Sequence, residues 1–558
     1  MCRVVLVISS WRFLSVSPGT LKARVSPFHP GVSPGPLGHH LLSPLRIMDS
    51  YSPASETDDP RLVWGHKFNW TSKHKTAPEL APLLYSYDKL ATDALDRLDD
   101  ISPPTSKAWR CPHGAGDGQR NLYVLLQKYA SSDEVLGQLW KEVSTVPEWV
   151  DWEQIERGQR VVYQFSGQIL LGLLYKSLLG GMGAYRVVET LSRTGGFGVR
   201  VTRRRLLETL QHFMEVVQDI DAVKPGGKGY VSSVRVRLLH AAVRRRLMQL
   251  EHERPGYFDM DKWGVPINDL HSIGTISVYS VAIIYMALPR QGIYLSEQQT
   301  ADYLALWRWV GYLLGTPVDW MATPAQAKVM MESVMTSEMA PSANSRILAN
   351  NILTAEARIP PLHAPRELLA AQAYQLNGDD LTGALGIEKP SWNYRAFVWV
   401  QCLVLFLLSY TYPWLPTHMQ KSRDREGGNV ADAVQQKFRN LAHFMITSKR
   451  VGGIGEATKF EFQYLPRIGM LTELGLPEEA NEKEVMGAST TSGPLRVMTR
   501  HASSRMLIRA VLIVGTVVGT VAVVSLARFV GASGWLRGTP RHLLSSVMAQ
   551  THLLQSLA

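Results

Sequence analysis

Cysteine is scarce in this sequence, which has three cysteines (Cys2, Cys111 and Cys402) among 558 residues. The sequence contains no CxxC pair and no histidine–cysteine cluster with zinc-ligand spacing. A disulfide-stabilised scaffold and a structural zinc site of common spacing are therefore excluded, and the redox compartment stays open. Hydrophobic residues make up 45% of the chain, which is enough to bury a large core.

Acidic residues are missing from both ends of the chain. Residues 1–47 carry a charge of +5 and residues 485–558 a charge of +7, so the residues between them carry about −1 of the net +11. A protein that binds DNA or RNA through its folded body needs a basic surface there. The charge distribution therefore predicts no nucleic-acid partner.

The common catalytic motifs are also missing. The sequence has no HExxH, no GxSxG, no P-loop and no complete dinucleotide-binding fingerprint, which argues against standard hydrolases, NTPases and nicotinamide enzymes. Strand signals are weak, because no alternating β-branched run is bounded by a hairpin dipeptide. From about residue 80 to 415 the pattern is helical, and we predict an all-α body.

The clearest helix signal lies between residues 296 and 315. Ser296 and Gln299 form a capping box, an apolar stripe follows at helical spacing, and Gly315 and Pro317 end it. This pattern predicts a helix of about 18 residues. Residues 270–289 carry no formal charge but contain Tyr, Ser, Thr and His, which favours a buried helix over a membrane span.

Residues 1–47 are rich in Arg, Ser and Pro and contain no acid. Such a composition fits an organelle-targeting segment, but it also fits an unstructured extension ahead of Met48. We divide the rest of the chain into an all-helical domain at 48–415, a polar linker with short helices at 416–505, an apolar segment at 506–530 and a basic tail at 531–558.

Two apolar segments bear on membrane association. Residues 396–408 are apolar for 13 positions, a length typical of a buried or an interfacial helix. Residues 510–527 form 18 uncharged residues between Arg509 and Arg528, which as a helix would span about 27 Å. We predict a single transmembrane anchor there, with a buried helix as the alternative.

The predicted anchor leaves two questions open. Its Gly515 and Gly519 form a GxxxG motif, which supports a homodimer through the membrane helix only weakly. Arginines flank it on both sides, so charge bias does not determine its orientation.

One basic helix, residues 231–250, stands out for its chemistry. Arg237, His240 and Arg244 occupy positions i, i+3 and i+7 and therefore share one helical face. Buried charges of this kind need partners. A haem would supply them, because imidazole ligates iron while arginines bind propionates. The alternative is a solvated basic face.

A second set lies upstream. Arg205, Glu208 and Thr209 fall at i, i+3 and i+4 of one predicted helix, and Glu189 lies on the preceding one. Taken alone, these residues are more typical of an ordinary amphipathic helix with surface ion pairs than of a functional site.

The combined pattern resembles a known family. Glu189, Arg205 and Thr209 followed by R-x-x-H-x-x-x-R at Arg237, His240 and Arg244 look like the haem-dependent oxygenases. That family includes the bacterial latex-clearing proteins (rubber oxygenases) and the fungal ER-bound oxygenase mpaB. The resemblance covers about residues 120–380.

The resemblance implies a globin-like helical core that holds haem b, with His240 as the iron ligand. Arg237 and Arg244 would steady the propionates or the histidine helix. Glu189 would be a catalytic base, and Arg205 and Thr209 would shape the distal pocket. The implied reaction is the oxidation or cleavage of an isoprenoid-type C=C bond by O2.

The sequence departs from the rubber-cleaving branch at one position. Glu208 stands where that branch has a lysine that can cap the iron, which argues against rubber as the substrate. Together with the predicted anchor, this favours a lipophilic metabolite as substrate and a single-pass location in the endoplasmic reticulum, with organelle targeting by residues 1–47 left open. The rival hypotheses are a helical membrane protein that binds haem or lipid without turnover, and a cofactor-free scaffold that contacts anionic lipid headgroups.

Overall fold

The structure is a computed structural model that describes residues 59–103, 120–194, 197–359 and 363–411. The chain divides into two units, Met1–Ser55 and Glu56–Ala558, and every described residue belongs to the second. The predicted extension at 1–47, the linker, the transmembrane segment at 510–527 and the basic tail lie outside the described residues.

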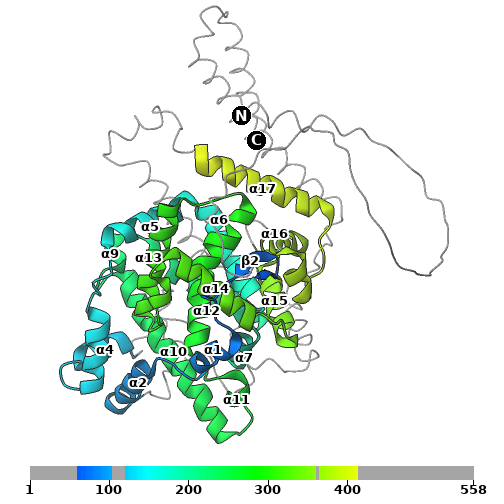
Figure 1. The fold of residues 1–558 in the computed structure, drawn as a ribbon. Coiled ribbons are helices and arrows are strands. Elements are labelled where there is room, and N and C mark those ends of the chain that lie inside the picture. Colours follow the sequence, from blue (N-terminus) through cyan, green and yellow to red (C-terminus); the bar gives the residue numbers. More distant parts are fainter. Residues whose placement is uncertain (1–58, 104–119, 195–196, 360–362, 412–558) are drawn as a thin grey trace, which may run out of the picture. The chain divides into compact units, whose positions relative to one another are not determined.

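Helices dominate the described part of the chain, as predicted (Figure 1). The first half contains α1 (Ala77–Leu80), α2 (Lys89–Ile101), α3 (Leu122–Tyr129), α4 (Glu134–Ser144), α5 (Trp152–Gln164), α6 (Ser166–Leu171), the π-helix η3 (Gly172–Leu179), α7 (Tyr185–Arg193), α8 (Val199–Val217) and α9 (Ile220–Val223). The second half contains α10 (Lys228–Glu253), α11 (Met260–Trp263), α12 (Asp269–Tyr279), the π-helix η4 (Ile283–Ala287), α13 (Glu297–Leu313), α14 (Pro324–Glu338), α15 (Ala343–Glu356), α16 (Arg366–Ala384) and α17 (Trp392–Thr411). Short 3-10 turns are η1 (Ala81–Leu84), η5 (Pro289–Gln291) and η6 (Asp319–Met321).

The sequence analysis missed one β-hairpin. Strands β1 (Asp59–Val63) and β2 (His66–Trp70) pair antiparallel, with Val63 opposite His66. Trp64 and Gly65 make the turn with φ values of 49° and 75°, a left-handed pair that normally calls for Asn-Gly. Trp64 adopts this conformation although it is not glycine or asparagine. Its indole Nε1 donates a hydrogen bond to the Met339 carbonyl at 3.0 Å.

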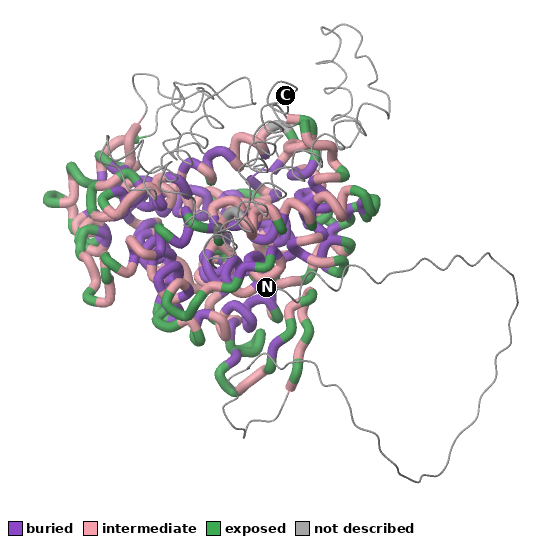
Figure 2. Tube along the Cα trace, turned by 90° about the horizontal axis from the view of Figure 1, so that it is seen from above, coloured by how far each residue is buried: buried purple, intermediate pink, exposed green. Residues whose placement is uncertain are grey.

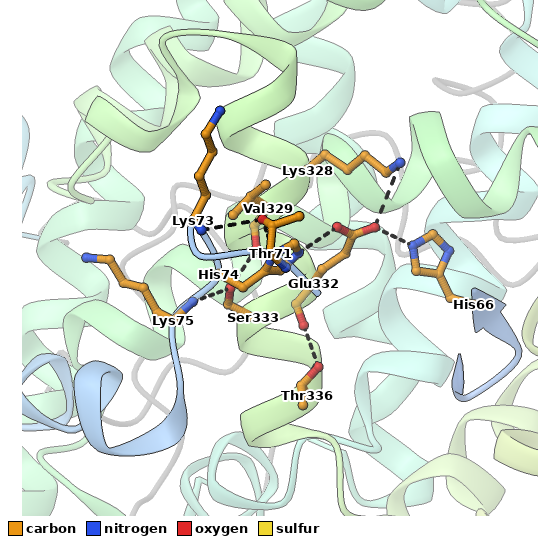
Figure 3. A network of polar contacts seen from close by, with 10 residues as sticks. All are labelled: His66, Thr71, Lys73, His74, Lys75, Lys328, Val329, Glu332, Ser333 and Thr336. Carbon is orange, nitrogen blue, oxygen red and sulfur yellow. Dashed lines mark hydrogen bonds and ion pairs between the residues drawn. The ribbon is translucent and has the colours of Figure 1, made fainter. Parts of the chain in front are cut away.

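A buried carboxylate joins this hairpin to α14 (Figure 3). The Glu332 oxygens contact Nε2 of His66 at 2.8 Å and Nε2 of His74 at 3.1 Å. Burial alone would raise the pKa of Glu332, but the hydrogen bonds with the two histidines and the charge of Lys328 lower it. The hairpin is therefore bound to the helical body by charge-assisted contacts.

The helix predicted from the capping box is confirmed as α13. The Gln299 backbone N–H donates to Ser296 Oγ at 3.1 Å, and Gln299 Oε1 accepts from the Ser296 N–H at 3.1 Å. Its Trp307 and Trp309 are among the largest fully buried side chains, and α13 packs along α5. The buried residues run through the helices that cross the interior (Figure 2).

Residues 270–289 are largely buried, but they do not form one straight helix. The segment breaks after Tyr279, and the two parts, Asp269–Tyr279 and Ile283–Gln291, meet at 42°. Within the described residues, no single helix has both the length and the apolar composition to cross a membrane, whereas this bent pair meets those criteria together. Leu270, Ile276 and Ile283 on it are nevertheless buried in the protein.

The apolar segment 396–408 lies within α17 and has two different faces. Val398 and Cys402 are buried, whereas Trp392, Trp399 and Leu403 are exposed. One side of the helix is therefore buried and the other is exposed, and the interfacial alternative stays a prediction.

Candidate functional site

Helices α8 and α10 form the centre of the candidate site. They pack against each other, and Gly229 makes the close approach possible. A Cβ atom at that position would lie 2.7 Å from the Glu215 carbonyl oxygen and 2.8 Å from the Val216 Cα. Arg205, Glu208 and Thr209 lie on α8, and Arg237, His240 and Arg244 lie on α10.

Arg237 is buried and paired with acids. Its Nε and Nη2 donate to the two oxygens of Asp88 at 2.7 and 2.9 Å, and its Nη1 donates to Glu142 at 2.8 Å. Burial on its own would lower the pKa of Arg237, but the hydrogen bonds and charges of Asp88 and Glu142 raise it. The guanidinium therefore joins α10 to the N-terminus of α2, which Asp88 caps.

Arg244 is also buried, and its donors go mainly to backbone oxygens. Its Nη1 donates to the Asp88 carbonyl and to Thr92 Oγ1, both at 3.0 Å, and its Nη2 donates to the Ile267 carbonyl at 2.9 Å. The guanidinium also lies over the Tyr87 ring. Arg244 thus holds α10 against the start of α2 and the loop before α12.

These contacts differ from propionate binding, which was one of two roles expected for the arginines. The protein itself supplies the acceptors, because Asp88, Glu142 and several carbonyl groups surround both guanidinium groups. A propionate would have to displace these partners. Both roles stay predictions, and these contacts would serve the second one, which is to steady the helix that carries His240.

His240 lies between the two arginines but is held differently. The imidazole is half-buried, and among the described residues neither ring nitrogen has a hydrogen-bond or ion-pair partner. Burial and the positive charges of Arg244 and Arg205 lower the pKa of His240 to about 4. The imidazole is therefore neutral at pH 7, which is the form that can ligate a metal.

Arg205 links α8 to His240 electrostatically, because its positive charge lowers the pKa of His240. Its Nη1 donates to Glu208 at 2.8 Å, and Arg204 Nε donates to the other oxygen of Glu208 at 3.0 Å. Glu208 is buried and doubly paired. It is therefore engaged by arginines of its own helix.

Thr209 keeps an exposed side chain and acts on the pKa of the Tyr279 hydroxyl. Burial raises the pKa of Tyr279 to about 12, although Thr209 acts in the opposite direction. Tyr279 is the last residue of α12, directly before the bend. Sequence reasoning did not select Tyr279.

Glu189 is buried on α7, and both its oxygens accept hydrogen bonds. Arg193 Nη1 donates to one at 3.0 Å, and Asn344 Nδ2 from α15 donates to the other at 2.9 Å. Within the described residues Glu189 makes no hydrogen bond with Arg205, Thr209 or His240. The structure therefore brings the α8 and α10 residues together. Glu189 contacts other residues, Arg193 and Asn344.

The partners that sequence reasoning missed are mostly distant in the chain. Asp88 and Arg237 are 149 positions apart, and Glu189 and Asn344 are 155 apart. Arg193 could have been found, because it lies four residues after Glu189 and therefore on the same face of α7. For Asp88, the only feature that the sequence could indicate was its place as a helix N-cap.

Fold and site together define a class of protein. The described residues form a mostly helical body in which buried arginines hold one helix in place, and that helix presents a neutral imidazole with no partner among these residues. Such a histidine is suited to bind a metal centre or a cofactor.

Comparison with known proteins identifies the family. Residues 133–405 match the family described as ER-bound oxygenase mpaB/B'/Rubber oxygenase, catalytic domain. All six predicted site residues lie within this range. The family predicted from the residue pattern is therefore confirmed.

Two relatives illustrate the similarity. A rubber oxygenase from Streptomyces sp. (strain K30) is 22% identical over 281 residues, a match that covers 48% of this chain and 66% of that protein. The chain thus spans just under two thirds of the relative's length. The solved structure of the latex clearing protein LCP in the closed state matches with 19% identity and a TM-score of 0.45, over 64% of this chain and 91% of that one.

Proposed function

We propose that this protein is a haem-dependent oxygenase that oxidises or cleaves a C=C bond of a lipophilic, isoprenoid-type metabolite with O2. The observation that carries the proposal is His240. It presents on α10 a neutral imidazole that has no partner among the described residues, inside the residues that match a family of oxygenases.

The residues around His240 fit a haem on the side of the iron ligand. A ligating histidine must be neutral, and the low pKa of His240 meets this requirement. Arg237 and Arg244 would act through the helix, because their donors hold α10 in place. Haem b, when bound, would supply the iron chemistry that activates O2.

The α8 residues would shape the distal pocket that the family resemblance implies. The positive charge of Arg205 acts on His240, and Thr209 keeps an exposed side chain that acts on Tyr279. The paired Glu208 is a carboxylate rather than a neutral amine, so it is a poor cap for iron. A carboxylate at position 208 therefore supports a substrate other than rubber. Arg205 and Thr209 would be the α8 residues that shape the distal pocket.

Glu189 is proposed as the base that accepts a substrate proton. Arg193 and Asn344 fix its carboxylate in one orientation, which is what proton transfer to a positioned group requires. We further propose that the segment at 510–527 anchors the protein in the endoplasmic reticulum membrane, where lipophilic substrates dissolve.

The test of the function is O2-dependent product formation. The full chain, supplied with haem, would be incubated with squalene as an isoprenoid probe under air or under nitrogen, and new carbonyl products would be measured by mass spectrometry. We expect products only under O2 and only with His240 intact. A protein that binds haem but forms no oxygenated product from this or related isoprenoid probes would be a non-catalytic haem-binding protein.

A further inference from the structure

The outward face of α17 carries four large apolar side chains. Trp392, Trp399, Leu403 and Tyr410 are 63%, 47%, 51% and 39% exposed. They occupy positions i, i+7, i+11 and i+18, so they share one face of the helix and form an apolar stripe about 27 Å long. Among the described side chains of α17, the other exposed one is Asn393. The outward face of α17 is therefore almost entirely apolar.

Contacts on the opposite side fix the orientation of α17. The helix packs against α16, α6 and η5 and lies along the outside of the helical body (Figure 1). Gln401 Oε1 accepts a hydrogen bond from Gln372 of α16 at 2.7 Å, and Ser409 Oγ accepts one from Gln168 of α6 at 2.9 Å. A rotation that buried the apolar stripe would break both hydrogen bonds. The stripe is therefore exposed because of how the helix is held.

Neighbouring side chains also position the rings of the stripe. The rings of Trp392 and Trp399 meet edge to face with centroids 5.1 Å apart, and Trp399 Nε1 donates to Gln375 Oε1 at 3.0 Å. At the other end of the helix, the Tyr410 ring lies 4.8 Å from the Phe406 ring. The apolar stripe is thus a preformed surface.

Negative charge is missing from this part of the chain. Residues 389–423 contain no Asp or Glu. Arg395 is the one charged residue in the sequence of α17, and it forms an ion pair with Asp379 at 3.6 Å. The charged residues that follow the helix, Lys421 and Arg423, are basic. A partner that approaches the apolar stripe therefore meets no acidic side chain on α17.

We propose that the apolar stripe of α17 lies in the interface of a lipid bilayer. Trp and Tyr side chains favour the level of the lipid headgroups, because their rings are apolar and their tips are polar. In the stripe they stand at both ends, with Leu403 between them. An acid-free helix followed by basic residues also suits the negative surface of a membrane that contains anionic lipids.

A second copy of the chain fits the apolar stripe less well. Four side chains that are about half exposed offer on the order of 400 Å², whereas a stable protein interface buries about 800 Å² on each partner. A bilayer sets no such minimum, because binding strength scales with the apolar area that is buried.

This contact does not depend on the oxygenase activity or on the proposed anchor at 510–527. A helix that lies in the interface is held less firmly than a helix that spans the bilayer. The contact would therefore add to the anchor, and its own effect would be to set which side of the body faces the lipid.

The experiment uses the full chain in vesicles of phosphatidylcholine and phosphatidylserine. The three native cysteines are replaced by alanine, and the fluorescent dye NBD is attached to the new thiol in Leu403→Cys. The matched control is Ile347→Cys, which carries the dye at an exposed apolar position of α15. Spin-labelled lipids quench the dye where it touches the bilayer.

We expect a blue-shifted emission in Leu403→Cys and quenching by spin-labelled lipid about threefold stronger than in Ile347→Cys. Equal quenching at the two positions would overturn the proposal. A blue shift without quenching would also overturn it, because protein would then cover the stripe, either another segment of this chain or a second copy.

A second measurement uses the native tryptophans, in case the dye disturbs α17. Brominated lipids quench tryptophan fluorescence, so the quenched fraction should fall in the double variant Trp392→Phe and Trp399→Phe. Trp263→Phe removes a half-buried tryptophan of α11 and should leave the quenched fraction as in wild type. The same quenched fraction in the double variant and in wild type would contradict the contact.

Discussion

His240 and Arg237 lie one helical turn apart on α10, but they differ in their hydrogen-bond partners. Arg237 is surrounded by acceptors, with three hydrogen bonds to Asp88 and Glu142. His240 has neighbouring positive charge and no partner among the described residues. The same helix therefore carries a residue that stabilises the fold and a residue that is left for a ligand.

The first residue-scale prediction concerns Arg237. Breaking a buried pair leaves a charge without a partner, so Arg237→Gln should lower the free energy of unfolding by about 3 kcal/mol. Arg246→Gln on the same helix removes an exposed pair with Glu253 and should change it by less than about 0.5 kcal/mol. Urea unfolding measures both. Equal effects would show that the Asp88 contact does not hold α10.

The second residue-scale prediction concerns Glu189. Glu189→Gln keeps the side chain's size but removes the proton acceptor, so turnover should fall about 100-fold or more while haem content stays the same. Glu156→Gln, which removes one exposed partner of Arg160, is the matched control and should retain wild-type turnover. Wild-type turnover in Glu189→Gln would remove Glu189 from the mechanism.

At the scale of elements, local signals predicted some parts well and others not at all. The α13 helix was predictable because its capping box and stop residues are all close in sequence. The hairpin was missed because its turn is Trp-Gly, a pair stabilised in this protein by a contact 275 residues away. The bend after Tyr279 was missed because no proline or glycine marks it.

In the candidate site, too, local spacing could be predicted and distant contacts could not. The shared face of Arg237, His240 and Arg244 could be derived from helical spacing, but the partners of both arginines come from α2, α4 and the loop before α12. Without those partners, propionate binding and helix stabilisation were equally compatible with the pattern. The tertiary contacts add partners that no local spacing could predict.

The element-scale prediction concerns the link between the hairpin and α14. The pKa of Glu332 is lowered in the folded state, so its contribution to stability is complete above its ordinary value near 4.5 and is lost as the pH falls below it. Between pH 6 and pH 3, wild type should therefore lose more stability than Glu332→Gln. Chemical unfolding midpoints measure this. Parallel pH profiles would contradict the role of Glu332.

At the scale of the whole molecule, the described helices account for the site but not for location in the cell. No single described helix meets the criteria for a membrane span, and the uncharged run at 510–527 lies outside the described residues. The proposed anchor and the proposed catalytic body are therefore separate parts of the chain, which can be tested separately.

The whole-molecule prediction is that a chain ending at Val485 leaves the membrane but still binds haem. An uncharged run of 18 residues can span a bilayer as a helix because its backbone groups bond internally. Membrane pelleting after a carbonate wash measures the change. If the shortened chain still pellets, the bent pair at 269–291 or helix α17 is the membrane element.

The most direct test of the central claim is the absorption spectrum of the full chain titrated with haem at pH 7. We predict a Soret band that saturates at one haem per chain in wild type and is lost or shifted in His240→Ala. His212→Ala, which changes another half-buried histidine, on α8 and in contact with Ser232 of α10, should keep the wild-type band. A His240→Ala spectrum and stoichiometry identical to wild type would contradict the account.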